Sequence, residues 1–74
     1  MNNFPLNEYV KVKRKLLGLS REELAQKAGV GLRFLRELEQ GKETLKMDKV
    51  NQVLKLFGVQ LGIVALDRNN LIEP

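Results

Sequence analysis

The apolar residues of this chain recur at helical spacing in four stretches, and a glycine follows each stretch. Residues three or four positions apart lie on the same face of an α-helix, so this spacing predicts four amphipathic helices. Their expected ranges are 8–17, 21–28, 32–40 and 47–57. Glycine readily adopts the left-handed backbone that commonly ends a helix. We therefore expect an all-α fold, with residues 1–74 forming a single domain.

The expected inner faces of the first and last helices follow from the same spacing. In the range 8–17, Tyr9, Val12 and Leu16 share one face. Asn7 precedes this range and is a suitable N-cap residue. In the range 47–57 the expected inner face consists of Met47, Val50, Leu54 and Phe57.

The two central stretches belong to one unit, which runs from Arg21 to Gln40. Ser20 and Glu23 have the spacing of a capping box, which predicts that a helix begins at Arg21. Positions 4, 5, 8, 9, 10, 15 and 18 of this unit are Leu24, Ala25, Ala28, Gly29, Val30, Leu35 and Leu38. This pattern is typical of a helix-turn-helix whose second helix enters the DNA major groove. An ordinary helical hairpin in a small bundle is the alternative.

Residues 59–66 have a different period. They are rich in β-branched residues and nearly alternate between apolar and other residues, which favours a strand over a fifth short helix. A strand needs a hydrogen-bonding partner, and the chain has no second strong strand pattern. We therefore expect this strand to pair with its copy in a second subunit, as a homodimer. The expected interface residues are Val59, Leu61, Ile63, Val64 and Leu66.

Composition narrows the class of function. The 74 residues include 13 Lys and Arg against 9 Asp and Glu, and the net charge of +4 suits a polyanionic partner such as DNA. Cysteine and histidine are both absent, which removes common metal ligands and the usual proton shuttle. We expect neither an enzyme nor a metal or cofactor site. No signal peptide or membrane span is recognisable, so the expected location is cytoplasmic and nucleoid-associated.

The run GLSREELAQKAGVGLRFLRELEQGK resembles helix-turn-helix repressors of the XRE type, also called the Cro/C1 type. This resemblance implies a lambda-repressor-like domain of four helices. The later run TLKMDKVNQVLKLFGVQLG, which ends in the expected strand, is similar to HipB-like antitoxins. Those proteins are the DNA-binding halves of toxin–antitoxin pairs whose toxin is a HipA-type serine/threonine kinase.

The resemblance implies a dimeric repressor that binds a palindromic operator, often in its own promoter, and that restrains a kinase partner. Two alternatives remain open. One is a stand-alone or phage-type repressor without a toxin. The other is a protein-interaction module that has lost DNA binding.

The residues expected to contact DNA lie mainly on the outward side of the third helix. Arg33 and Arg36 are the best candidates, because an arginine can bond both acceptors of a guanine edge. Leu32 and Phe34 could contact thymine methyl groups or cover a helix junction, and Glu37 could orient an arginine. The full set is Lys13, Arg21, Gly31, Leu32, Arg33, Phe34, Arg36, Glu37, Gln40 and Lys42.

Two departures from the family pattern limit what can be transferred. Relatives commonly carry glutamine where this chain has Arg21, and polar residues where it has Gly31, Leu32 and Phe34. The base preference of a relative therefore does not carry over. Glu39 is expected to be structural. A basic cluster is expected on the outer side of the first helix, to contact phosphates or face solvent, and it consists of Lys11, Lys13, Arg14 and Lys15.

Overall fold

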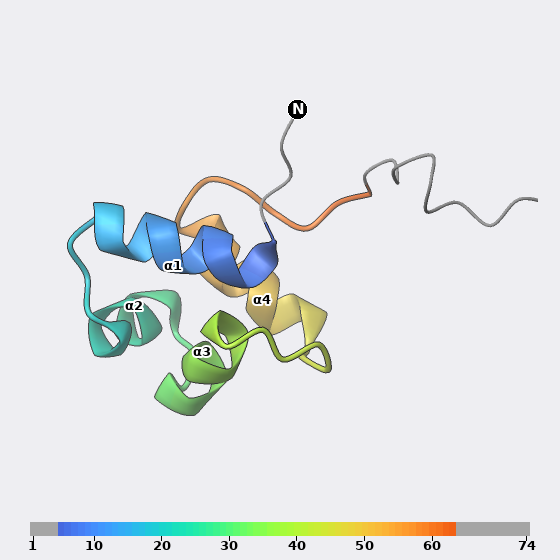
Figure 1. The fold of residues 1–74 in the computed structure, drawn as a ribbon, viewed down its shortest axis with the longest axis horizontal. Coiled ribbons are helices and arrows are strands. Elements are labelled where there is room, and N and C mark those ends of the chain that lie inside the picture. Colours follow the sequence, from blue (N-terminus) through green and yellow to red (C-terminus); the bar gives the residue numbers. More distant parts are fainter. Residues whose placement is uncertain (1–4, 64–74) are drawn as a thin grey trace, which may run out of the picture.

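The computed structural model describes residues 5–63 and contains four α-helices within that range (Figure 1). Helix α1 spans Leu6–Leu16, α2 spans Arg21–Ala28, α3 spans Leu32–Glu39 and α4 spans Met47–Lys55. Helix α3 packs against α1 and α2, and α2 also packs against α4. Residues 29–31 connect α2 to α3, so these two helices form a helix-turn-helix. None of the described helices is long and apolar enough to cross a membrane.

All four helices contribute to one hydrophobic core. Its buried residues are Val10, Leu24, Ala25, Ala28, Val30, Leu35, Leu38, Val50, Val53 and Leu54. Six of the seven pattern residues of the central unit are among them, which confirms the inward face that the spacing predicts. The seventh, Gly29, has a φ of 75° and ends α2. Glycines with positive φ follow the other three helices in the same way, at positions 18, 41 and 58.

Helix α1 begins two residues earlier than its spacing predicts. Pro5 occupies the N-cap position, and its carbonyl accepts a hydrogen bond of 2.9 Å from the N–H of Tyr9. A proline fits a helix start because its φ is already close to the helical value and it has no N–H to leave unpaired there. Asn7 consequently lies inside the helix, and its expected role as the N-cap residue is wrong.

The inner face of α1 also differs from the expected one. Val10 and Arg14 are buried, whereas Val12 is exposed and Leu16 retains 74% of its accessible surface. Arg14 reaches Glu39 of α3, and this pairing turns the Val10–Arg14 side of α1 towards the core. The expected placement of Val12 and Leu16 inside, and of Arg14 on the outer side, is therefore wrong.

Helix α4 ends at Lys55, earlier than expected, because the hydrogen bonding changes in its last turn. The N–H groups of residues 56–58 donate to the carbonyls of residues 53–55, three positions back, as in a 3₁₀ turn. Val50 and Leu54 are buried and Phe57 is half-buried, as the spacing predicts. Met47 is instead largely exposed, so its expected place in the core is wrong.

A side chain of α4 holds the turn between α2 and α3 in place. The side-chain amide of Gln52 donates hydrogen bonds of 2.9 and 3.1 Å to the carbonyls of Ala28 and Gly29. These carbonyls lie at the end of α2, where no further helical N–H is available to them. One α4 side chain therefore stabilises the C-terminus of α2 and fixes the start of the connection to α3.

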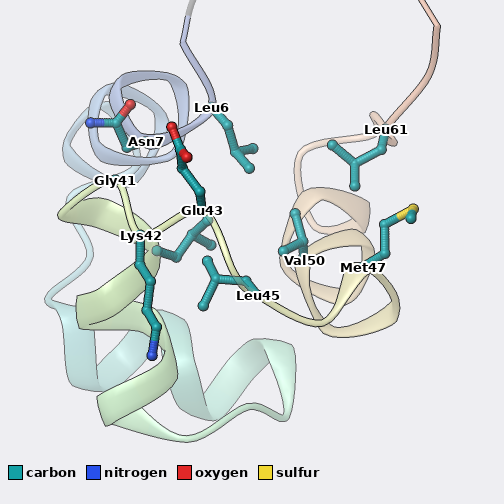
Figure 2. Close-up of a pocket in the computed structure, with 10 residues that line it drawn as sticks. Leu6, Asn7, Gly41, Lys42, Glu43, Leu45, Met47, Val50 and Leu61 are labelled. Atoms are coloured by element: carbon teal, nitrogen blue, oxygen red, sulfur yellow. The ribbon is translucent and has the colours of Figure 1, made fainter.

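After α4, residues 59–63 carry no assigned secondary structure. The N–H of Leu61 donates a 2.7 Å hydrogen bond to the side-chain oxygen of Asn51, which holds this segment on α4. Leu61 also borders a hollow of about 440 Å³ opposite Leu6 and Leu45 (Figure 2). Val64 and Leu66 lie outside the described residues. The strand and its pairing between subunits remain predictions.

Candidate nucleic-acid interface

Helix α3 has one buried side and one side open to solvent. Leu35 and Leu38 are fully buried between α3 and the rest of the fold. On the opposite side, Arg33, Arg36 and Gln40 are exposed. Because the buried side is anchored in the core, α3 presents its two arginines from a rigid element.

A single carboxylate lies between two cations on this face. A carboxylate oxygen of Glu37 is 3.6 Å from Nε of Arg33 and 3.5 Å from Nζ of Lys42. The Arg33 side chain is 91% exposed, and ion pairs in water contribute little stability. Both cations can therefore exchange Glu37 for a phosphate or a base without a large cost to the fold.

The apolar residues at the start of α3 differ in their surroundings. Phe34 is half-buried and packs against the core, which favours the packing role that the sequence left open for it. Leu32 is also half-buried. Gly31, just before the helix, is exposed, and a Cβ built on it would have no neighbour within 4 Å. The backbone at the start of α3 is thus accessible to a ligand.

Behind this face, two arginines converge on one carboxylate, and we call Arg14, Arg21 and Glu39 the Arg–Glu–Arg cluster. Arg14 donates to both Glu39 oxygens, at 2.7 and 3.2 Å, and to the carbonyl of Leu19 at 2.9 Å. Arg21 donates through Nε to Glu39 at 3.0 Å. Glu39 and Arg14 are buried, whereas the Arg21 side chain is 45% exposed. The cluster links α1, the start of α2 and the end of α3.

The burial of Glu39 confirms its expected structural role, but the sequence interpretation missed its partner Arg14. A weak signal exists, because Leu6, Val10 and Arg14 are spaced four residues apart and so share one face of a helix. A buried carboxylate also needs a cation or several hydrogen bonds. Neither signal identifies which of the neighbouring basic residues supplies the charge.

The start of α2 is fixed by the capping box that the sequence predicts. The Ser20 hydroxyl accepts a 3.0 Å hydrogen bond from the Glu23 N–H, and the Glu23 carboxylate accepts one of 2.8 Å from the Ser20 N–H. The backbone N–H of Ser20, and then its hydroxyl, lower the pKa of Glu23 below its ordinary value of 4.5. This stabilisation is complete above pH 4.5 and is lost as the pH falls through the lowered pKa. The box places Arg21 at the first helical position.

Lys13 lies apart from the other candidate DNA contacts. Its ammonium is 5.7 Å from the centre of the Tyr9 ring, which in turn packs edge-on against Phe57. Lys13 also borders a shallow hollow of about 250 Å³ whose other lining residues are Leu16, Leu17, Leu56 and Phe57. None of these residues belongs to α2 or α3. The structure therefore does not bring Lys13 together with Arg33 and Arg36.

Residues 5–63 contain no group of three or more acidic side chains that could hold a metal ion. Most of the charged candidate contacts are instead cations. The candidate cations Arg21, Arg33, Arg36 and Lys42 lie on or beside α2 and α3, and Glu37 is paired with two of them. The first turn of α2 also carries the exposed Glu22 and Glu23. Exposed arginines and lysines attract a polyanion.

Comparison with known proteins adds two similarities. A helix-turn-helix family model matches residues 10–64, which is more than half of the chain. Over 56 residues the chain is 48% identical to the uncharacterized HTH-type transcriptional regulator y4mF of Sinorhizobium fredii (strain NBRC 101917 / NGR234). That similarity covers 76% of this chain and 74% of the relative.

Proposed function

Because the chain belongs to the XRE type of helix-turn-helix transcriptional regulators, we propose that it is a sequence-specific repressor that inserts α3 into the major groove of a palindromic operator. The observation that carries this proposal is the pair of exposed arginines, Arg33 and Arg36, on a helix whose opposite side is buried. A rigid helix with outward arginines is suited to reading guanine edges.

The proposed contacts divide into two groups. Arg33 and Arg36 read bases, since they project from the outward side of α3. The residues around them position the protein on the DNA backbone or shape the groove contact, and they are Arg21, Gly31, Leu32, Phe34, Glu37, Gln40 and Lys42. Lys13 is left out of this set because the residues that line the hollow beside it belong to α1 or directly follow α1 and α4.

A pair of substitutions tests the division. Arg33→Ala should weaken binding to the promoter of the protein's own gene by about 1–3 kcal/mol while changing binding to a scrambled duplex much less. Lys42→Ala should weaken both by similar factors and lower the slope of log affinity against log salt by about one. Titrations of both duplexes at several salt concentrations measure these effects.

Lys55→Ala is a matched control for the loss of one positive charge, because Lys55 is the last residue of α4 and is exposed. It should bind both duplexes almost as the wild type does. Equal losses on the two duplexes for Arg33→Ala would refute base reading by that residue.

We further propose that this regulator is the antitoxin of a HipA-type kinase and represses the operon that encodes both. The likeness of residues 44–62 to HipB-like antitoxins supports this proposal. Affinity purification from native cells, with bound protein and bound DNA both identified, tests it. A kinase recovered together with the protein's own promoter is the expected result.

Two other results of that purification would replace the proposal. Promoter DNA without a kinase would indicate a stand-alone repressor. A protein partner without DNA would indicate an interaction module, for which the specific support is the apolar Leu32 and the acidic Glu37 at the α3 face.

A further inference from the structure

We propose that Glu39 is a positioning residue, which holds the guanidinium of Arg21 at the end of α3 so that its two terminal nitrogens bind a phosphate of the DNA backbone. This inference rests on the DNA-binding function proposed above. It gives the buried carboxylate a role in binding and assigns Arg21 to the backbone instead of to a base.

The Arg–Glu–Arg cluster has two positive charges and one negative charge, so the charge of Arg21 is in excess. Arg14 contacts both oxygens of Glu39 and is buried with it, so these two groups already compensate each other. The third donor group of Arg14 is satisfied by the Leu19 carbonyl. Glu39 therefore does not need a second cation, and the positive charge of Arg21 remains available to a ligand.

The geometry leaves the outer end of Arg21 open. Its guanidinium uses Nε for the 3.0 Å bond to Glu39, and Nη1 and Nη2 have no hydrogen-bond partner among residues 5–63. A guanidinium is planar, so a bond at Nε restricts the direction in which the terminal nitrogens point. Their fork of N–H groups matches the oxygens of a phosphate. Because Glu39 restricts the side chain beforehand, less conformational freedom is lost on binding.

The position of the cluster favours phosphate over base. In a helix-turn-helix the first turns of the second helix go deepest into the major groove. Arg21 is bonded to the last residue of α3, at the opposite end of that helix. A side chain held there faces the edge of the groove, where the backbone runs.

Two substitutions of Arg21 test the inference by fluorescence anisotropy on the promoter duplex and a scrambled duplex. Arg21→Ala should bind both about tenfold more weakly and lower the salt slope by about one, as expected for one lost phosphate contact. Arg21→Lys keeps the charge but has no planar fork, so it should recover only a small part of the loss. Lys55→Ala again controls for net charge, and thermal unfolding of each variant shows that the fold is retained.

Each contrary result has a distinct meaning. Arg21→Ala binding as tightly as Lys55→Ala would overturn the phosphate contact, and a loss confined to the promoter duplex would make Arg21 a base-reading residue. Arg21→Lys binding as the wild type does would overturn the role of Glu39, since charge alone would suffice. Unfolding of Arg21→Ala would make the Arg21–Glu39 bond purely structural. If the wild type bound neither duplex, the proposed function itself would fail and this inference with it.

Discussion

Arg14 shows how one buried charge determines the orientation of a helix. A buried guanidinium is tolerated only where its charge and N–H groups are paired. Glu39 and the Leu19 carbonyl satisfy that need on the side of α1 that also carries Val10. The apolar residues Val12 and Leu16, which fit a helical face equally well by spacing, consequently face outwards.

This orientation makes a direct prediction about stability. Val10→Ala should lower the free energy of unfolding by about 2 kcal/mol, because Val10 is fully buried and the substitution leaves a cavity. Leu16→Ala removes more atoms but should change it by less than about 0.5 kcal/mol, because Leu16 is mostly exposed. Urea unfolding followed by circular dichroism compares the two. A larger loss for Leu16→Ala would show that α1 is rotated from the position described here.

The Arg–Glu–Arg cluster shows which contacts of single residues can be predicted from the sequence and which cannot. The Ser20–Glu23 capping box spans only four residues, so its spacing alone predicts both hydrogen bonds. Arg14 and Glu39 are separated by 25 positions. No local pattern connects residues that far apart. The sequence could predict that Glu39 is structural, but it could not predict that Arg14 pairs with it.

At the scale of elements, helix ends follow local chemistry where a strong signal is present. The capping box and Gly29 bracket α2, and the observed Arg21–Ala28 has the expected range. Helix α1 starts earlier than expected because Pro5 itself occupies the N-cap position. Helix α4 ends earlier because its last turn tightens, which depends on hydrogen-bond geometry and not on residue type.

Contacts between elements are harder to predict than the elements. Gln52 is a polar residue on α4, and nothing in its local sequence indicates that its amide caps the end of α2. Asn51, its neighbour, likewise binds the backbone of Leu61. Both side chains fix the positions of other segments relative to α4. From their spacing alone, both would be assigned simply to the solvent-facing surface of that helix. The helix-turn-helix could be predicted from sequence, but these supports of the candidate site could not.

At the scale of the whole molecule, the proposed dimer depends on the segment that follows α4. Removing every residue after Gly58 would be a poor test of dimerisation. Leu61 packs against the core and its N–H bonds to Asn51, so truncation would also weaken the folded subunit. A useful variant must leave the single subunit intact and alter only what a second subunit would cover.

Ile63→Ser meets that requirement, because the Ile63 side chain is fully exposed in the single chain. Replacing this side chain should therefore leave the fold of the subunit unchanged. If residues 59–66 pair across a two-fold axis, burial of Ile63 stabilises the dimer by roughly 1.5–3 kcal/mol. The dissociation constant of the Ile63→Ser dimer should therefore be about tenfold or more higher than that of the wild type. Sedimentation equilibrium measures this shift, with Gln60→Ser as a control at an exposed polar position of the same segment. Operator affinity should fall in parallel, since a palindromic site is read by two subunits held at a fixed spacing. A monomeric wild type, or equal dissociation of the wild type and Ile63→Ser, would contradict the predicted interface. Neither result would decide whether a single α3 helix reads DNA, which the Arg33→Ala experiment tests separately.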